Sequence, residues 1–250
     1  MPNAARDAPN PGPGQQADEP VRFFRWSSLV YPLLHPTWVR WIVLSFVTAL
    51  AAGMIALTAK GFSEGLGPLK ALVTVCLALS AYLAASFVEI IEQTAHGSDR
   101  LNHLPGFAWL EILRPFAQTA GAAVIAALAA YGLSYPLRGY LTDTQLHLIR
   151  AISVFQLFPI LLMSNLADQR WLPIASLPTT LNRFSCCAGS FVLFLIVSAV
   201  TTVVTVAPLL LLTAWDFGAG LAASGPLLST WFMLYGHWLG RLARQLMRIE

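Results

Sequence analysis

The sequence is organised as long runs of apolar residues separated by short polar segments. A helix needs about 20 mostly apolar residues to cross the hydrocarbon core of a bilayer. Six runs meet this requirement, and they cover residues 41–59, 69–91, 115–133, 148–167, 185–215 and 218–239. We therefore predict an all-α protein: a polytopic bundle of six transmembrane helices with short amphipathic helices at the membrane interface.

Two segments need a more detailed interpretation. The run at 185–215 has 31 residues and contains Pro208, which is too short for two spans but long for one. A tilt, a kink at Pro208 or an interfacial end would absorb the excess. The segment at 106–114, GFAWLEILR, has its apolar residues on one helical face. It predicts a short amphipathic helix before the third span, with Trp109 as its headgroup anchor.

The composition supports a membrane protein over a soluble one. Hydrophobic residues make up 56% of the chain and charged residues 11%, whereas soluble domains have about 25% charged residues. The net charge of +3 does not indicate nucleic-acid binding, because the basic residues stand singly near the ends of the apolar runs. We expect the lipid bilayer to be the main partner of the protein, and no nucleic acid.

The basic residues also predict the orientation of the chain. With six spans and an internal N-terminus, eleven Lys and Arg residues fall on one side and four on the other. The four are Lys60, Lys70, Arg138 and Arg150. Because cytoplasmic loops carry the excess of positive charge, both termini are predicted to be cytoplasmic.

Local composition predicts how the rest of the chain is divided into segments. Residues 1–20 are rich in Pro, Gly, Asn and Gln, which predicts a disordered cytoplasmic tail. Residues 21–40 mix aromatic and basic side chains, as at the headgroup level, and form an interfacial segment or a partner-docking arm. The spans occupy 41–240, and 241–250 is a basic cytoplasmic C-terminus.

The polar segment EIIEQTAHGSDRLNH, residues 89–103, is the densest cluster of titratable side chains. Glu89, Glu92 and His96 share one helical face, but their spacing differs from the Glu-x-x-His of di-iron bundles. We interpret the segment as a helix extension ended by a left-handed Gly97. It also provides a possible partner-recognition surface: Glu92, His96, Asp99, Arg100 and His103.

The sequence indicates no catalytic residue, cofactor site or metal site. The run GFSEG at residues 61–65 has the spacing of a G-x-S-x-G motif, but no strand precedes it, and it lies in a loop on the predicted outer side. No phosphate-binding loop in the right context is present. The three cysteines, Cys76, Cys186 and Cys187, form no disulfide framework and have no zinc-finger spacing. The adjacent pair is interpreted as apolar packing, with a redox site as the alternative.

Neutral polar residues inside the spans leave two interpretations open. Gln118, Gln156 and Asn165 can form hydrogen bonds between helices. In a transporter, the same three side chains would line a water-accessible cavity. No series of acidic or basic residues crosses the membrane, so the sequence gives little support to ion-coupled transport.

Small residues predict where helices approach closely. Ala122, Ala126 and Ala130 recur every four residues, and Gly236 and Gly240 form a GxxxG pair. Such spacing permits tight helix packing. The glycine pair has two interpretations: packing within the bundle, or a homo-oligomer through Gly236 and Gly240.

Two loops on the predicted cytoplasmic side are alike. In each, an Asp is followed by a Leu-Pro pair and, 15 residues after the Asp, by an Arg: Asp99 to Arg114, and Asp168 to Arg183. A tandem duplication would produce this similarity. Coincidence would also produce it, because Pro in loops and Arg at cytoplasmic ends are common.

Residues 94–99, TAHGSD, lie near Pro105, Trp109 and Pro115 in the chain. Together they resemble the cytoplasmic hairpin of a group of bacterial multi-pass inner-membrane proteins of uncharacterised role. The C-terminal Tyr235 and the run LGRLA at 239–243 add to the resemblance. Members of that group carry more acidic residues after the Asp, where this chain has Arg100, Asn102 and His103. The resemblance implies a bacterial inner-membrane protein and no particular activity.

These observations lead to a functional expectation without an enzymatic reaction. We expect an integral membrane component that acts through packing and through contacts with a membrane or cytoplasmic protein partner. The alternative is a small transporter or permease subunit. Nothing in the sequence identifies a substrate or ligand.

Overall fold

The computed structural model describes residues 29–33, 37–61, 67–98, 101, 103–106, 108–168 and 177–247. The elements are η2 (Tyr31–Leu33), α1 (Thr37–Gly61), α2 (Gly67–Ala95), α3 (Trp109–Ser134), η3 (Tyr135–Gly139), α4 (Asp143–Asp168), α5 (Leu177–Cys186), α6 (Ala188–Trp215) and α7 (Phe217–Met247). Within these ranges every regular element is a helix, so the all-α prediction is confirmed.

Six of these helices, namely α1, α2, α3, α4, α6 and α7, are long and apolar enough to cross a membrane. The prediction of six spans is therefore confirmed, and the chain is a multi-pass membrane protein. Large apolar side chains cover the outer faces of the spans, as on α6, where Val200, Val203 and Val204 are exposed. Such faces suit contact with lipid, because lipid tails are as apolar as these side chains.

The structure corrects three predicted boundaries. Helix α1 begins at Thr37, so residues 37–40 of the predicted interfacial segment belong to the first span. Residues 109–114 are the first turns of α3, which continues through Pro115, and no separate amphipathic helix occurs there. The run at 185–215 is divided at Cys187 between α5 and α6. Hydropathy does not resolve these boundaries, because apolar residues lie on both sides of each one.

Pro208 and Pro159 lie inside α6 and α4 without ending either helix. A proline removes only one backbone hydrogen bond, and membrane helices tolerate it because neighbouring groups satisfy the freed carbonyl.

Helix α5 is a short helix between the fourth and fifth spans. It buries Thr180 and Phe184, one turn apart, and exposes Leu181. It is the short amphipathic helix of the fold.

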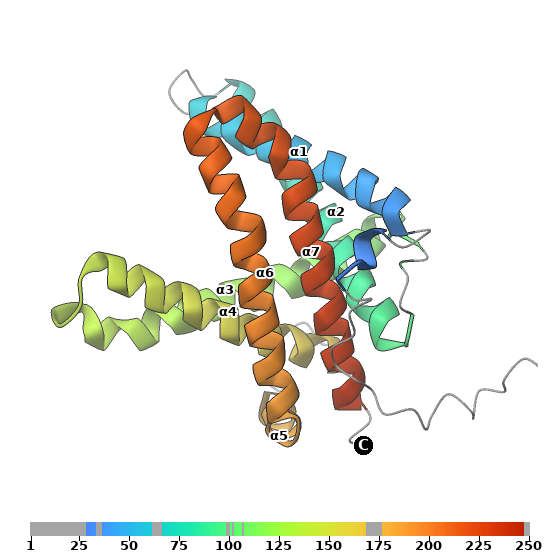
Figure 1. The fold of residues 1–250 in the computed structure, drawn as a ribbon, viewed down its shortest axis with the longest axis vertical. Coiled ribbons are helices and arrows are strands. Elements are labelled where there is room, and N and C mark those ends of the chain that lie inside the picture. Colours follow the sequence, from blue (N-terminus) through green and yellow to red (C-terminus); the bar gives the residue numbers. More distant parts are fainter. Residues whose placement is uncertain are drawn as a thin grey trace, which may run out of the picture.

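Helix α7 is the central helix of the bundle and packs against α1, α2 and α6. In Figure 1, α6 and α7 run side by side, while the hairpin of α3 and α4 projects away from them. All residues from 233 to 242 are buried, so the second half of α7 is covered on every side. This half is rich in apolar residues around its whole circumference, as expected for a buried helix.

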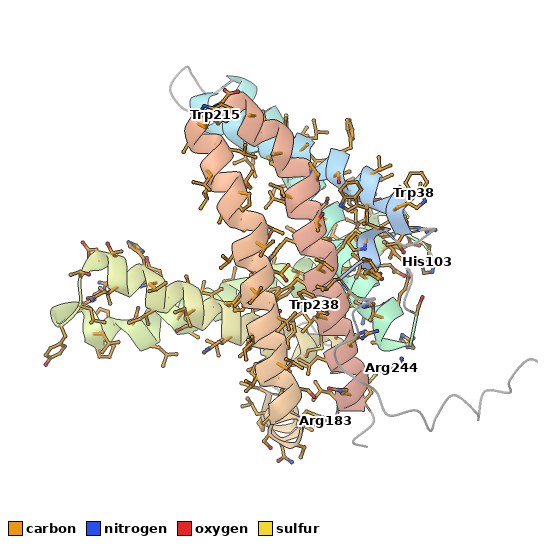
Figure 2. The ribbon with its side chains drawn as sticks, viewed as in Figure 1. Trp38, His103, Arg183, Trp215, Trp238 and Arg244 are labelled. Atoms are coloured by element: carbon orange, nitrogen blue, oxygen red, sulfur yellow. The ribbon has the colours of Figure 1, made fainter. Side chains whose placement is uncertain are left out.

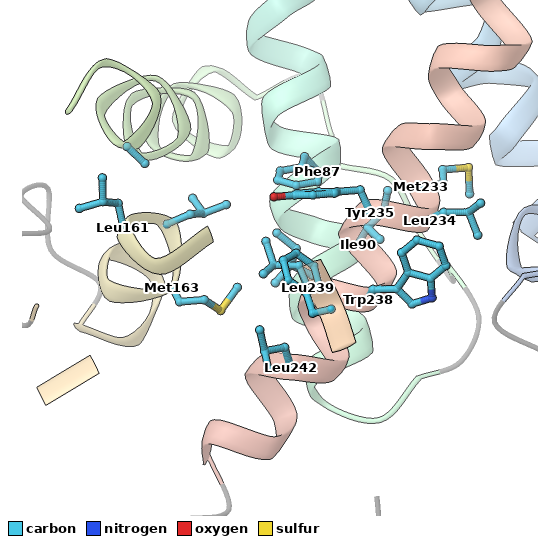
Figure 3. Packing of buried hydrophobic residues seen from close by; sticks show 14 of the residues in the cluster. Phe87, Ile90, Leu161, Met163, Met233, Leu234, Tyr235, Trp238, Leu239 and Leu242 are labelled. Carbon is cyan, nitrogen blue, oxygen red and sulfur yellow. The ribbon is translucent and has the colours of Figure 1, made fainter. Parts of the chain in front are cut away.

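The ring of Tyr235 on α7 is the centre of the core, and Figure 3 shows it lying across Phe87 of α2. Its centroid is 6.0 Å from that of Phe87, 5.9 Å from Phe155 of α4 and 5.4 Å from Phe194 of α6. Aromatic pairs at these separations attract one another through their quadrupoles and dispersion. One side chain thus joins four spanning helices.

Glycines allow α7 to approach its neighbours closely. A Cβ on Gly240 would lie 2.6 Å from the carbonyl oxygen of Ile91 and 2.6 Å from Cβ of Thr94, and one on Gly236 would lie 3.1 Å from Ile90. The GxxxG pair therefore packs against α2 of the same chain. A homo-oligomer through the pair stays a prediction.

The alanine stripe of α3 forms the seam with α4. Ala122, Ala126 and Ala130 are all buried, at 0%, 0% and 1% exposure. Near one end of the stripe, Nδ2 of Asn165 donates to the backbone carbonyl oxygen of Gln118 at 3.2 Å, which confirms an interhelical hydrogen bond for Asn165. At the other end, Nε of Arg150 donates to Oγ of Ser134 at 2.9 Å. Polar contacts thus bracket a tightly packed apolar seam.

The packing of Gly240 generates the first prediction. The substitution Gly240→Ala should destabilise the protein by about 1–3 kcal/mol, because the new Cβ overpacks the contact with α2. Thermal unfolding of the purified protein in detergent measures the effect. Gly121→Ala on α3 is the matched control, because no atom lies within 4 Å of its added Cβ. Equal melting temperatures for the two variants would contradict the assigned packing.

Candidate functional site

The predicted cluster at residues 89–103 lies at the end of α2. The helix continues to Ala95 and ends at Gly97, which has a φ of +95°. The N–H of Ser98 donates to the carbonyl of Gln93 at 2.9 Å, and that of Gly97 to the carbonyl of Thr94 at 3.0 Å. These two bonds form a Schellman motif. The predicted glycine stop is therefore confirmed.

The turn at Gly97 also contacts α7. The guanidinium of Arg244, near the end of α7, covers this turn, and a Cβ on Gly97 would lie 3.0 Å from its Nη2. Figure 2 places Arg244 and Arg183 towards one end of the molecule and Trp215 at the opposite end. The turn after α2 and the C-terminal part of α7 thus form one surface.

The five predicted recognition residues have different positions. Glu92 and His96 are exposed, and Nδ1 of His96 lies 2.7 Å from the carbonyl oxygen of Glu92. The side chain of His103 is 70% exposed, with its Nδ1 3.0 Å from Oε1 of Glu89. Asp99 and Arg100 lie outside the described residues. The three that are described therefore belong to one exposed surface at the end of α2.

Gln93 organises this surface from below. Its side chain is only 9% exposed, and its Nε2 donates to Oε1 of Glu89 at 2.7 Å and to the carbonyl oxygen of His103 at 2.9 Å. The same Nε2 contacts Nδ1 of His103. One buried amide thus holds the segment after the turn against α2. The sequence places Gln93 in the cluster, but its role was not predicted.

The beginning of α1 holds the same segment from the other side. The N–H of Leu101 donates to Oγ1 of Thr37 at 3.1 Å, and Nη1 of Arg40 donates to the carbonyl oxygen of Leu101 at 2.5 Å. The Leu101 side chain is fully buried. These partners are more than 60 positions apart in the chain, so no local sequence signal reveals them.

Beneath the turn, a buried polar layer connects α2, α7 and η2. Nδ1 of His237 lies 3.2 Å from Oγ1 of Thr94, and its ring stacks on Tyr31 with centroids 4.1 Å apart. His237 is 1% exposed. A buried imidazole with a hydroxyl partner fixes the rotation of α7 relative to α2, because an unpaired polar group would be costly there. The layer positions the turn and has no access to solvent.

Two cavities flank Glu92. One, of 480 Å³, lies among α2, α3 and α4 and includes Glu89, Glu111, Arg114 and Gln118 in its lining. The other, of 420 Å³, is mostly apolar and includes His96 and Arg183. Glu92 lines both. The contribution of α3 was not predicted from the sequence, although Glu111, Arg114 and Gln118 share a helical face at i, i+3 and i+7.

The described residues provide little for metal or thiol chemistry. Among them, no three His, Cys, Asp or Glu side chains are grouped so that they can hold a metal ion. Burial and the neighbouring Cys186 thiol raise the pKa of the Cys187 thiol. A raised pKa disfavours the thiolate, which is the reactive form of cysteine.

The role of Gln93 generates the second prediction. Gln93→Ala should speed amide hydrogen exchange in the peptide containing Leu101 and His103 about tenfold, because buried hydrogen bonds that close this segment are lost. Hydrogen–deuterium exchange with mass spectrometry measures it. Gln156→Ala is the control, since Gln156 is an exposed amide on α4. Unchanged exchange in the Gln93 variant would show that the amide does not hold the segment.

No protein-family model, curated protein or solved structure matches the chain. The geometry of the end of α2 and the packing of the spans are therefore the features that bear on function.

Proposed function

We propose that the protein is a non-enzymatic component of a bacterial inner membrane that contacts a protein partner through the exposed end of α2. The observation that carries this proposal is the grouping of Glu92, His96 and His103 on one exposed and internally braced surface. Conformationally fixed polar residues bind with a smaller entropic cost than mobile ones. The recognition surface comprises these three residues and, from the sequence, Asp99 and Arg100.

The interior of the bundle supports this role over that of a transporter. Asn165 is 0% exposed, and its Nδ2 donates to the backbone carbonyl of Gln118 within the α3–α4 seam. The Gln118 side chain lines the cavity near the ends of α2 and α3 and not the centre of the bundle. Hydroxyl groups in α6, such as those of Thr201 and Thr205, donate to carbonyls of their own helix. Side chains with these local bonds do not create a water-lined path.

The proposed orientation places the recognition surface in the cytoplasm. Arg183, Arg241 and Arg244 lie in the helices at the same end of the bundle as the turn after α2. The excess of basic residues on that side of the chain favours a cytoplasmic location. A cytoplasmic protein, or the cytoplasmic part of a membrane protein, would then be the partner.

A third prediction tests the recognition surface. A photo-crosslinking amino acid at position 96 should form an adduct with a specific protein in cells. When the variant Glu92→Ala/His96→Ala/His103→Ala is purified, recovery of that protein should fall at least about tenfold, because interface contacts are lost. Affinity purification followed by mass spectrometry measures recovery. Gel filtration of the variant checks that it remains folded.

The matched control changes the opposite end of the spans. Asp143 and His147 are exposed at the start of α4, and Asp143→Ala/His147→Ala should leave recovery of the partner unchanged. An equal loss of the partner in both variants, or no loss in either, would count against the surface at the end of α2.

A fourth prediction separates the transporter alternative and tests the orientation. In a chain without its native cysteines, Asn165→Cys should remain unlabelled by a membrane-impermeant maleimide, because the site is buried in the seam. His147→Cys should be labelled in intact cells and His96→Cys only after permeabilisation. Labelling of Asn165→Cys from the aqueous phase would favour a transport path instead.

A further inference from the structure

The cavity of 420 Å³ lies between α4 and the pair formed by α2 and α7, and α5 also contributes to its lining. Helix α4 packs chiefly against α3 and α5. Figure 1 shows the α3–α4 hairpin projecting away from α7. The cavity is thus formed where α4 diverges from the other helices. Each of the four helices supplies lining residues, among them Ile91 and Ala95 of α2, Met163 and Leu166 of α4, Arg183 of α5 and Leu246 of α7.

The cavity lies at the level where the spans end. Ala95, Leu166 and Met247 are the last residues of the second, fourth and sixth spans, and all three line the cavity. The ends of spans mark the boundary between the hydrocarbon core of the bilayer and its headgroups. Ile91 and Met163 line the cavity about one turn deeper in their spans. The cavity therefore extends from headgroup depth into the hydrocarbon region.

The inner wall of the cavity is apolar and comes from three helices. Ile91, Met163 and Leu246 are 1%, 5% and 5% exposed. Apolar space that stays unfilled loses dispersion contacts, and an acyl chain at this depth would restore them. A methionine adapts its shape to such a chain, because its side chain is flexible and polarisable. The volume lies in the range of sites for organic molecules, about 300–1,000 Å³.

The rim of the cavity carries basic side chains. Arg183 lines it from the last turn of α5 and is half-buried. The guanidinium of Arg244 covers Gly97, which is next to the lining residue His96. Figure 2 shows Arg183 and Arg244 towards the same end of the molecule. Positive charge on the rim favours an anionic headgroup above the apolar wall.

Glu92 is the single carboxylate in the lining of this cavity. The charged groups that act on it are Glu89, His96 and Arg114. Two of these, Glu89 and Arg114, line the other cavity, which Glu92 also lines. The charge of Glu92 therefore acts chiefly towards α3 and not towards Arg183.

We infer that this cavity binds an anionic phospholipid, with part of one acyl chain against the apolar wall and the phosphate at Arg183. A guanidinium binds a phosphate through paired N–H donors, and its five donors allow it to do so in addition to binding a protein partner. Basic pockets between spans on the cytoplasmic side suit anionic headgroups. The inference goes beyond the proposed partner contact, because Arg183 and the apolar wall lie outside the recognition surface.

Native mass spectrometry of the full-length protein in detergent tests the headgroup. Phosphatidylglycerol and phosphatidylethanolamine with matched acyl chains are added, and the wild type should bind phosphatidylglycerol in preference. Arg183→Gln should reduce phosphatidylglycerol binding roughly tenfold and remove the preference, since a charge-assisted hydrogen bond to the phosphate is lost. Met247→Glu should also remove the preference, because it adds a carboxylate to the lining at a position that is 49% exposed and tolerates a polar side chain.

Arg138→Gln is the matched control for the charge change. Arg138 is exposed at the opposite end of the spans, and its loss should leave lipid binding unchanged. Equal binding of the two lipids by the wild type would overturn the inference. A preference that survives both Arg183→Gln and Met247→Glu, or an equal loss in Arg138→Gln, would also overturn it.

A second pair of variants tests the acyl chain. Ala243→Trp places an indole in the cavity and should reduce the binding of both lipids, because it removes space whatever the headgroup. Ala127→Trp, on an exposed face of α3, should leave binding unchanged. Equal binding in these two variants, with melting temperatures that show both to be folded, would contradict the cavity as the site. Arg183→Gln and Met247→Glu provide the test if Ala243→Trp does not fold. Since none of the substitutions changes the recognition surface, loss of lipid is distinguishable from loss of the protein partner.

Discussion

The close contact between α2 and α7 is the interaction on which the rest of the structure depends. Lipid supplies no hydrophobic force between helices, so their association requires close packing of small residues and interhelical hydrogen bonds. Gly240 and Gly236 bring α7 directly against the backbone and side chains of α2. At this separation, Tyr235 reaches the aromatic rings of α2, α4 and α6, and His237 reaches Thr94. The core and the buried polar layer are consequences of the same contact.

The contact also positions the surface at the end of α2. Arg244 covers the left-handed Gly97, and Gln93 and the start of α1 hold the following segment in place. Glu92 and His96 are thereby displayed on a braced surface and not on a loose loop. On the other side of Glu92, the face of α3 completes the cavity of 480 Å³.

Much of the fold and part of the site are predictable from the sequence. The six spans, the glycine stop at Gly97 and the hydrogen bond of Asn165 all follow from local composition or single residue types. The division of the run at 185–215 into α5 and α6 does not, because hydropathy is continuous through Cys187. The role of Gln93 also escaped prediction, since its partner His103 lies beyond a turn whose path the sequence does not specify.

The sequence by itself determined which segments enter the membrane, because transfer of an apolar run into lipid depends on its own residues and hardly on its neighbours. Only the tertiary structure decided which helix faces meet. Spanning helices are apolar on nearly every side, so their periodicity does not distinguish a face towards lipid from a face towards protein. The pairing of Gly240 with Ile91, of Leu101 with Thr37 and of the Glu92 face with Gln118 therefore emerged only from packing.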